Sequence, residues 1–86
     1  ITIEELWQKY LEQNGRCAIT NIPLIIPPRT TAKKTDITAS VDRIDSNGIY
    51  EISNIRWVHK TINCIKWSWT DEYFNSMCQK ILNYKE

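Results

Sequence analysis

Apolar residues recur every three or four positions at the start of the chain, which is the spacing of one face of an α-helix. They are Ile3, Leu6, Trp7, Tyr10 and Leu11. Thr2 and Glu5 have the spacing of a capping box, and Asn14-Gly15 is typical of a helix end. The pattern predicts a first helix that begins after Thr2 and ends before Asn14.

The next segment has no helical period. Residues 17–19 (Cys-Ala-Ile) predict a short strand that turns at Thr20-Asn21. Prolines at positions 23, 27 and 28 exclude a helix before about residue 30. The polar stretch from Arg29 to Thr38 predicts a loop with Lys33 and Lys34 at its tip.

Two β-prone runs follow, from Ala39 to Asp45 and from Asn54 to Val58, and they predict two strands joined by a loop. Residues from about 59 to 66 predict a helix with an apolar face toward the core and a separate polar face. The apolar face holds Val58, Ile62 and Ile65, and the polar face holds His59, Asn63 and Lys66.

A last helix is predicted after Thr70, which is in place to cap it. Its apolar residues form a continuous stripe that we expect to be core. The stripe consists of Tyr73, Phe74, Met77, Cys78, Ile81 and Leu82. We expect Trp67 and Trp69 to wedge this helix against the strands, the alternative being that they stack on unpaired bases.

Composition limits what these elements can build. The chain has 86 residues, enough for one core, so we expect a single domain over residues 1–86. It opens at Ile1, which indicates a processed product or a part of a longer chain. Three cysteines without paired spacing indicate a reducing compartment. No apolar run approaches the roughly 20 residues of a membrane helix. A net charge of +1 does not by itself indicate a nucleic-acid binder.

The segment from Ser40 to Lys66 carries the candidate chemistry. It contains Val41-Asp42-Arg43-Ile44-Asp45-Ser46, then Asn54-Ile55-Arg56-Trp57-Val58, then Ile62-Asn63-Cys64-Ile65-Lys66. In this order and spacing it resembles the HNH (ββα-metal, His-Me finger) endonucleases, in an Asp-Arg variant. The resemblance implies an α+β fold in which a β-hairpin packs on a helix, with flanking N- and C-terminal helices and the core motif at residues 40–66.

The resemblance also implies a role for each matching residue. Asp42 and Asn63 would hold one divalent ion, Mg²⁺ or else Mn²⁺, because phosphodiester hydrolysis needs a hard cation with oxygen ligands. Asn54 would shape the loop between the strands, and Lys66 would add a contact to the DNA backbone. Taken singly, Asp42 is more typical of a surface ion pair and Asn63 of a solvent-facing helix residue.

The family's general-base histidine is replaced by Arg43, whose guanidinium cannot accept a proton at neutral pH. We expect Arg43 to contact the scissile phosphate and another group to deprotonate the water. His59, the only histidine, is the most obvious candidate for the replacement base. Its position, however, matches a zinc-ligand position of such relatives. We therefore favour a structural role for His59 beside Cys17. Tyr10 and Tyr50 are further candidates, each more typical of a packed aromatic.

The zinc knuckles of such relatives are incomplete in this chain. The partners of Cys17 and His59 would be Thr20 and Ile62, so two groups remain where structural zinc requires four. We therefore expect no structural zinc.

Together the motifs predict a metal-dependent DNA endonuclease or nickase of bacterial or phage origin in the cytoplasm, with no membrane partner. Its candidate catalytic residues are Asp42, Arg43, Asn54 and His59, and its candidate DNA contacts are Arg43, Lys66, Lys33 and Lys34. An ordinary solvated loop is an equal alternative for the two loop lysines. Specificity would come from a homodimer or from additional domains. The alternatives are an inactive DNA-binding or interaction module of the same fold, and a small helical interaction domain.

Overall fold

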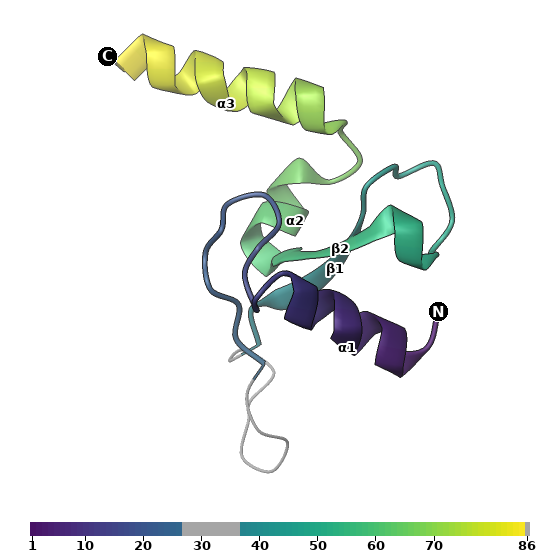
Figure 1. The fold of residues 1–86 in the computed structure, drawn as a ribbon. Coiled ribbons are helices and arrows are strands. Elements are labelled where there is room, and N and C mark those ends of the chain that lie inside the picture. The colour runs from purple at the N-terminus through teal and green to yellow at the C-terminus, as the bar shows by residue number, and fades with distance from the viewer. Residues whose placement is uncertain (27–36, 86) are drawn as a thin grey trace.

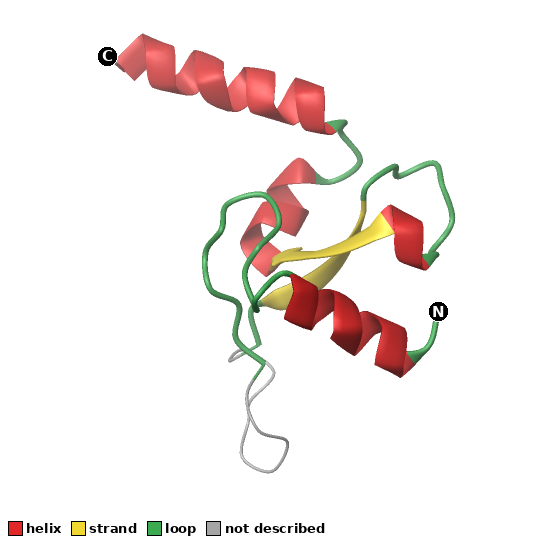
Figure 2. Ribbon diagram, viewed as in Figure 1, coloured by secondary structure: helices red, strands yellow, loops and turns green. Residues whose placement is uncertain are grey.

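The computed structural model describes residues 1–26 and 37–85. In chain order the elements are α1 (Ile3–Glu12), β1 (Ala39–Arg43), the short 3-10 helix η2 (Ile52–Asn54), β2 (Ile55–His59), α2 (Lys60–Lys66) and α3 (Asp71–Lys85) (Figure 1). The two strands pair as an antiparallel hairpin, α1 and α2 lie against it, and α3 extends away from it (Figure 2). The predicted α+β class is confirmed, with a hairpin and a helix in a ββα-like arrangement.

The first helix begins and ends as predicted. Thr2 Oγ1 accepts a hydrogen bond from Glu5 N at 3.1 Å, and Thr2 N donates to Glu5 Oε1 at 3.0 Å, so the capping box is complete. Gly15 has φ +65°, and its N–H donates to Tyr10 O at 3.0 Å. This left-handed turn ends the helix where the Asn14-Gly15 pair predicts it.

The register of the hairpin decides which side chains can meet. The opposed pairs are Ser40 and Val58, Asp42 and Arg56, and Arg43 and Ile55. Side chains alternate between the two faces of a strand, so Ser40 and Asp42 share one face of β1 and Arg43 belongs to the other. Both predicted strands are present, with bounds that differ from the expected ones by one or two residues.

The core lies between the hairpin, α1 and the segment that follows α1. Its buried apolar residues are Cys17, Leu24, Ile55 and Val58. Trp57 ties β2 to α1, because its indole N–H donates to Leu6 O at 2.9 Å. The Gln13 side chain adds two more links, accepting from Trp57 N and donating to Trp57 O, each at 2.9 Å. The N-terminal helix is therefore anchored to the strand that leads into α2.

The predicted strand at residues 17–19 is wrong. Residues 18–20 form a turn, and Arg16 makes an isolated bridge with Pro23. Cys17 N donates to Ile22 O at 2.8 Å, and Asn21 has φ +63°. The chain reverses within this segment. Ala18 N donates to Trp57 O of β2 at 3.0 Å, but this single bond does not continue into a ladder.

The face that α2 turns toward the hairpin is polar, contrary to prediction. Lys66 is 1% exposed and Ile65 is 60% exposed. The reason lies in β1, whose adjoining face carries Ser40 and Asp42, and these bond to Asn63 and Lys66 of α2. A lysine can be buried where a carboxylate compensates its charge. The apolar period of the helix could not reveal this ion pair.

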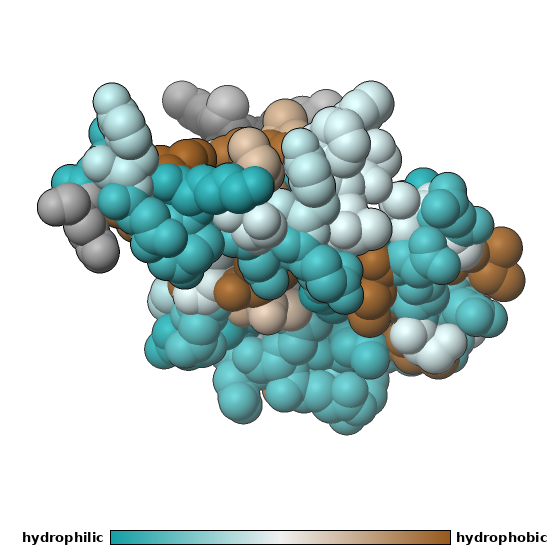
Figure 3. Space-filling view, turned by 90° about the horizontal axis from the view of Figure 1, so that it is seen from above, coloured by the Kyte–Doolittle hydropathy of each residue, from teal (hydrophilic) through white to brown (hydrophobic). Residues whose placement is uncertain are grey.

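The prediction that the apolar stripe of α3 is core is also wrong. No residue of α3 is buried, and Met77, Ile81 and Leu82 are each at least 40% exposed. The stripe borders a hollow of about 280 Å³ that Ile65 of α2 also lines. Seen from the side on which α3 lies, hydrophilic side chains cover most of the surface, with apolar ones in the gaps (Figure 3). At 1.5 Å per residue, α3 is about 22 Å long, roughly twice the length of α2, so α2 cannot cover it.

The two loop lysines, Lys33 and Lys34, which are predicted either to contact DNA or to belong to a solvated loop, lie outside the described residues. Their role stays a prediction.

Among the helices that the structure describes, none has the length and apolar character needed to span a bilayer.

Candidate metal and phosphate site

Asp42 lies at the centre of a cluster of charged side chains. Its side chain is 6% exposed, and its Oδ2 accepts a hydrogen bond at 3.0 Å from Nε of Arg56, the residue opposite it on β2. Lys66 Nζ, from α2, lies 3.4 Å from the same oxygen. A carboxylate can be buried here because two cations compensate it.

Asp71, the first residue of α3, completes the cluster. Its Oδ2 and Oδ1 accept hydrogen bonds from Arg56 Nη1 and Nη2 at 2.9 Å and 2.7 Å, which is a bidentate pairing. Lys66 Nζ lies 3.3 Å from Asp71 Oδ1. The cluster of Asp42, Arg56, Lys66 and Asp71 thus joins the hairpin, α2 and α3 with two positive and two negative charges.

The contacts between Arg56 and Asp71 favour the charged forms of both side chains. The hydrogen bonds from Arg56 hold the pKa of the Asp71 carboxyl below its ordinary value, against the opposing effect of burial. Burial lowers the pKa of Arg56, but the hydrogen bonds and charges of Asp71 and Asp42 outweigh it and leave that pKa raised. The pair of Arg56 and Asp71 is therefore fully ionised at neutral pH.

Asn63 lies one helical turn before Lys66, on the same side of α2. Its Nδ2 donates to Ser40 Oγ at 2.7 Å, and Ser40 shares a face of β1 with Asp42. Lys66 in turn reaches Asp42 itself. The structure therefore brings the strand carboxylate and the helix amide, predicted as metal ligands, to one interface between β1 and α2.

Each of these two side chains keeps one oxygen without a hydrogen-bond partner among the described residues. The contacts of Asp42 fall on Oδ2, which leaves Oδ1, and Ser40 occupies the amide nitrogen of Asn63, which leaves its carbonyl oxygen. Carboxylate and amide oxygens are donors that Mg²⁺ accepts beside water and phosphate. The two side chains therefore offer the types of oxygen that a hard cation binds.

The surroundings of these donors limit how a cation can bind. Arg56 and Lys66 place two positive charges beside Asp42. Over residues 1–26 and 37–85, no group of three or more His, Cys, Asp and Glu side chains could hold a metal ion. A cation at Asp42 and Asn63 would therefore need the negative charge of a phosphate as a further ligand, which is how Mg²⁺ commonly binds in phosphate-handling sites.

Asn54 organises the loop between the strands. Its Oδ1 accepts from Asp45 N at 2.9 Å, and its Nδ2 donates to Asp45 O and Ile49 O, both at 3.0 Å. A Cβ on Gly48 would lie 2.6 Å from Asn54 Nδ2, so the loop can close on Asn54 only with glycine there. This is the loop-shaping geometry that the sequence predicts for Asn54, and it uses the whole side-chain amide.

Arg43 lies apart from the cluster. Its Nη1 donates to Gly48 O at 2.9 Å, and its guanidinium lies over the Tyr50 ring, 4.9 Å from the centroid. As the neighbour of Asp42 on β1, it points to the other face of the strand. The structure does not bring Arg43 to Asp42 and Asn63, and its contact with a scissile phosphate stays a prediction.

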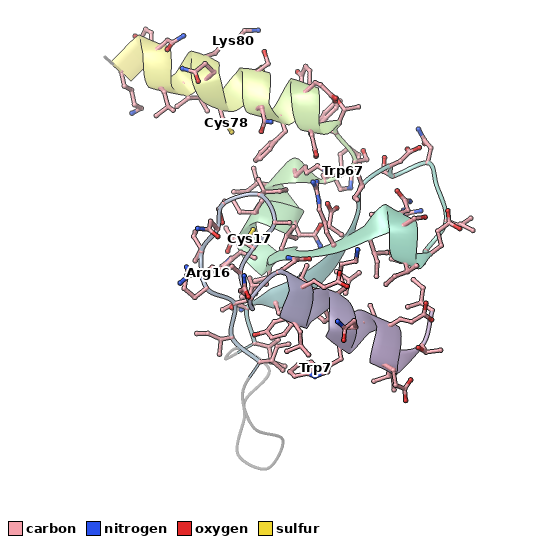
Figure 4. The ribbon with its side chains drawn as sticks, viewed as in Figure 1. Trp7, Arg16, Cys17, Trp67, Cys78 and Lys80 are labelled. Atoms are coloured by element: carbon pink, nitrogen blue, oxygen red, sulfur yellow. The ribbon has the colours of Figure 1, made fainter. Side chains whose placement is uncertain are left out.

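His59 lies at the end of β2, opposite Ala39. Its Nδ1 accepts from Thr61 N at 3.1 Å and so caps α2. The thiol of Cys17, labelled in Figure 4, accepts a hydrogen bond from the His59 backbone. Burial raises the pKa of this thiol, but hydrogen bonds from Thr20 and from the His59 and Ile19 backbones outweigh burial and lower that pKa. This placement agrees with the structural role beside Cys17 that the sequence favours for His59.

Sequence reasoning missed Arg56 and Asp71. Arg56 had a usable signal, because residues directly opposite on a hairpin interact, and pairing the two predicted strands could have placed it against Asp42. The sequence carries almost no signal that could have identified Asp71, since acidic residues are common in the first turn of any helix.

Comparisons of this chain with protein-family models, with curated proteins and with solved structures find no match. The link to HNH endonucleases therefore remains a resemblance in the motif residues.

Proposed function

We propose that this chain is a metal-dependent nuclease domain, an endonuclease or nickase that hydrolyses phosphodiester bonds in DNA. The supporting observation is the meeting of Asp42 and Asn63 at the interface of β1 and α2, each with an oxygen that has no partner among the described residues. This donor set suits Mg²⁺ or Mn²⁺. Such an ion, when bound, neutralises charge on the phosphate and assists the leaving oxygen.

The chain's own side chains would hold the phosphate next to those donors. Lys66 is fixed by Asp42 and offers a positive charge at the same interface. Arg56 has a planar guanidinium that can bond two phosphate oxygens at once. Asn54 keeps the loop after β1 in one conformation through its three hydrogen bonds. Arg43 would have to release Gly48 O before it could contact the scissile phosphate.

Cleavage of supercoiled plasmid DNA in Mg²⁺ or Mn²⁺ tests the proposal. We expect Asn63→Ala to lower the cleavage rate by about 100-fold, because it removes one of two protein donors to the ion. Asn75→Ala, the same change at an exposed position of α3, should leave the rate unchanged. Circular dichroism verifies that both variants fold. Equal rates for the wild type and Asn63→Ala would remove the metal assignment.

A DNA-binding module without catalysis is the second candidate. It is favoured by the replacement of the expected histidine by Arg43 and by the use of His59 Nδ1 as a helix cap. On this alternative, the chain binds DNA in a salt-sensitive manner and leaves the plasmid intact with either metal. Metal-dependent cleavage that Asn63→Ala abolishes would exclude it.

A further inference from the structure

Asp71 is held in the manner in which proteins hold phosphate. Two parallel hydrogen bonds from one guanidinium reach its two oxygens, and an ammonium group lies 3.3 Å from one of them. Bidentate arginine and a point charge from lysine are the common ligands of both carboxylate and phosphate. The carboxylate therefore occupies a place whose chemistry also suits a phosphate group.

The two cations stay in place without Asp71. Asp42 is bonded to Arg56 at 3.0 Å and to Lys66 at 3.4 Å from the inner side of the cluster. The Asp42 side chain is 6% exposed and that of Asp71 is 35% exposed, so Asp71 is the outer and more accessible anion. If Asp71 leaves, Arg56, Lys66 and Asp42 together carry one excess positive charge, which matches the single negative charge of a phosphodiester.

The element that carries Asp71 can move with little loss of packing. Asp71 begins α3, and no residue of α3 is buried. A turn at Trp67, which has φ +51°, ends α2 and starts the short connection to α3. Figure 4 shows Trp67 between the two helices. Displacing Asp71 therefore disturbs an ion pair and a lightly packed helix, not the core around Val58.

We propose that Arg56 and Lys66 form a phosphate-binding site in which the carboxylate of Asp71 stands in for a phosphodiester of nucleic acid. A backbone phosphate takes the place of Asp71, and the first turn of α3 detaches from the hairpin as it does so. Asp71 thereby competes with the substrate and weakens binding of the free protein to DNA. The choice of DNA as the source of the phosphate rests on the proposed function, whereas the site itself does not.

Binding of a short fluorescein-labelled DNA duplex, followed by anisotropy in EDTA, tests this competition. Asp71→Asn removes the competing charge, and we expect it to bind about fivefold more tightly than the wild type. Glu72→Gln is the matched control, because it changes the net charge equally at the next, exposed residue of the same helix turn. It should change the affinity by less than about twofold. Equal gains in the two variants would overturn the proposal, since they would reflect net charge alone.

A second measurement titrates the wild-type protein and uses Asp71→Asn only as the reference for the signal positions without the ion pair. Amide NMR signals of residues 72–74 should shift as the DNA duplex is added, toward the positions that they have in Asp71→Asn. Inorganic phosphate is the second arm, and shifts with phosphate but not with DNA would assign the site to free phosphate instead. Unchanged signals in both titrations would overturn the proposal.

These outcomes separate the site from the nuclease assignment, because EDTA prevents metal-dependent cleavage during the binding measurements. A protein that cuts plasmid DNA but shows no difference between Asp71→Asn and Glu72→Gln keeps the proposed function and loses this inference. A protein that shows the difference but never cuts DNA keeps the phosphate site and loses the nuclease.

Discussion

At the scale of single residues, Asp42 has a structural and a candidate catalytic role. Its Oδ2 compensates Arg56 and Lys66, while its Oδ1 is the candidate metal ligand. Removal of the whole carboxylate therefore affects folding as well as any reaction. Loss of cleavage in Asp42→Ala does not by itself identify a metal ligand, which is why Asn63 is the more informative position.

We expect Asp42→Ala to lower the free energy of unfolding by about 3 kcal/mol, because it leaves the buried Lys66 and the partly buried Arg56 without their inner anion. Asp42→Asn keeps the shape and one acceptor oxygen, so its loss should be smaller. Urea denaturation followed by tryptophan fluorescence measures both. Glu51→Ala, which removes an exposed carboxylate from the hairpin loop, should cost less than about 0.5 kcal/mol. Equal midpoints for Asp42→Ala and Glu51→Ala would show that the cluster does not stabilise the fold.

At the scale of elements, α2 and α3 both depart from their apolar patterns, for different reasons. In α2, the polar face is buried because β1 offers a carboxylate and a hydroxyl to Lys66 and Asn63. In α3, the apolar stripe stays largely exposed because the neighbouring α2 is too short to cover it. A period of 3.6 residues shows that a helix has two faces, but the neighbouring element decides which face is buried.

Core and stripe residues should therefore differ sharply in their effect on stability. We expect Val58→Ala to cost about 2 kcal/mol, because Val58 is fully enclosed and its loss leaves a cavity. Met77→Ala should cost less than about 1 kcal/mol, although it removes more atoms, because Met77 is 40% exposed on α3. Thermal unfolding followed by circular dichroism compares them. A larger loss for Met77→Ala would mean that α3 packs more tightly than the structure shows.

At the scale of the whole molecule, the charged cluster is the link between α3 and the rest of the protein. The chain has 11 basic and 10 acidic residues, so its net charge of +1 gives little general attraction to DNA. With Asp71 in place the cluster is neutral as well. Attraction to a phosphate at this site therefore depends on whether α3 is docked.

The docking of α3 should depend on pH in acid. The pKa of Asp71 lies below its ordinary value, so its contribution is complete above about pH 4 and is lost as the pH falls through the lower, folded value. The raised pKa of Arg56 means that the cation stays charged throughout this range. We expect the NMR signals of residues 72–74 to move in acid toward those of Asp71→Asn at about pH 7, before the signal of the core residue Leu24 changes. Signals of 72–74 and Leu24 that change together would contradict this.

Local signals of the sequence determined the helix ends, the two strands and the loop. The capping box at Thr2, the Asn14-Gly15 stop and the Thr70 cap act through hydrogen bonds within a few residues of each other, so the sequence is enough to place them. The order of Asp42, Asn54, Asn63 and Lys66 singled out the candidate site through a resemblance, and its role stays a prediction. The short strand expected at Cys17 failed because a strand needs a continuous ladder, and this segment has an isolated bridge between Arg16 and Pro23 and a single bond from Ala18 N to Trp57 O.

Only the tertiary structure decided how the charges are paired. Three features depend on which faces of the neighbouring elements meet. They are the burial of Lys66, the bidentate hydrogen bonding of Arg56 to Asp71, and the separation of Arg43 from Asp42. Charge–charge contacts depend on distance in space, and three of the four ion pairs of the cluster join residues that lie 14 to 24 positions apart along the chain. The sequence by itself determined where the elements are and which residues are chemically able to act, and the packing of α2 and α3 on the hairpin decided which of these residues lie close together.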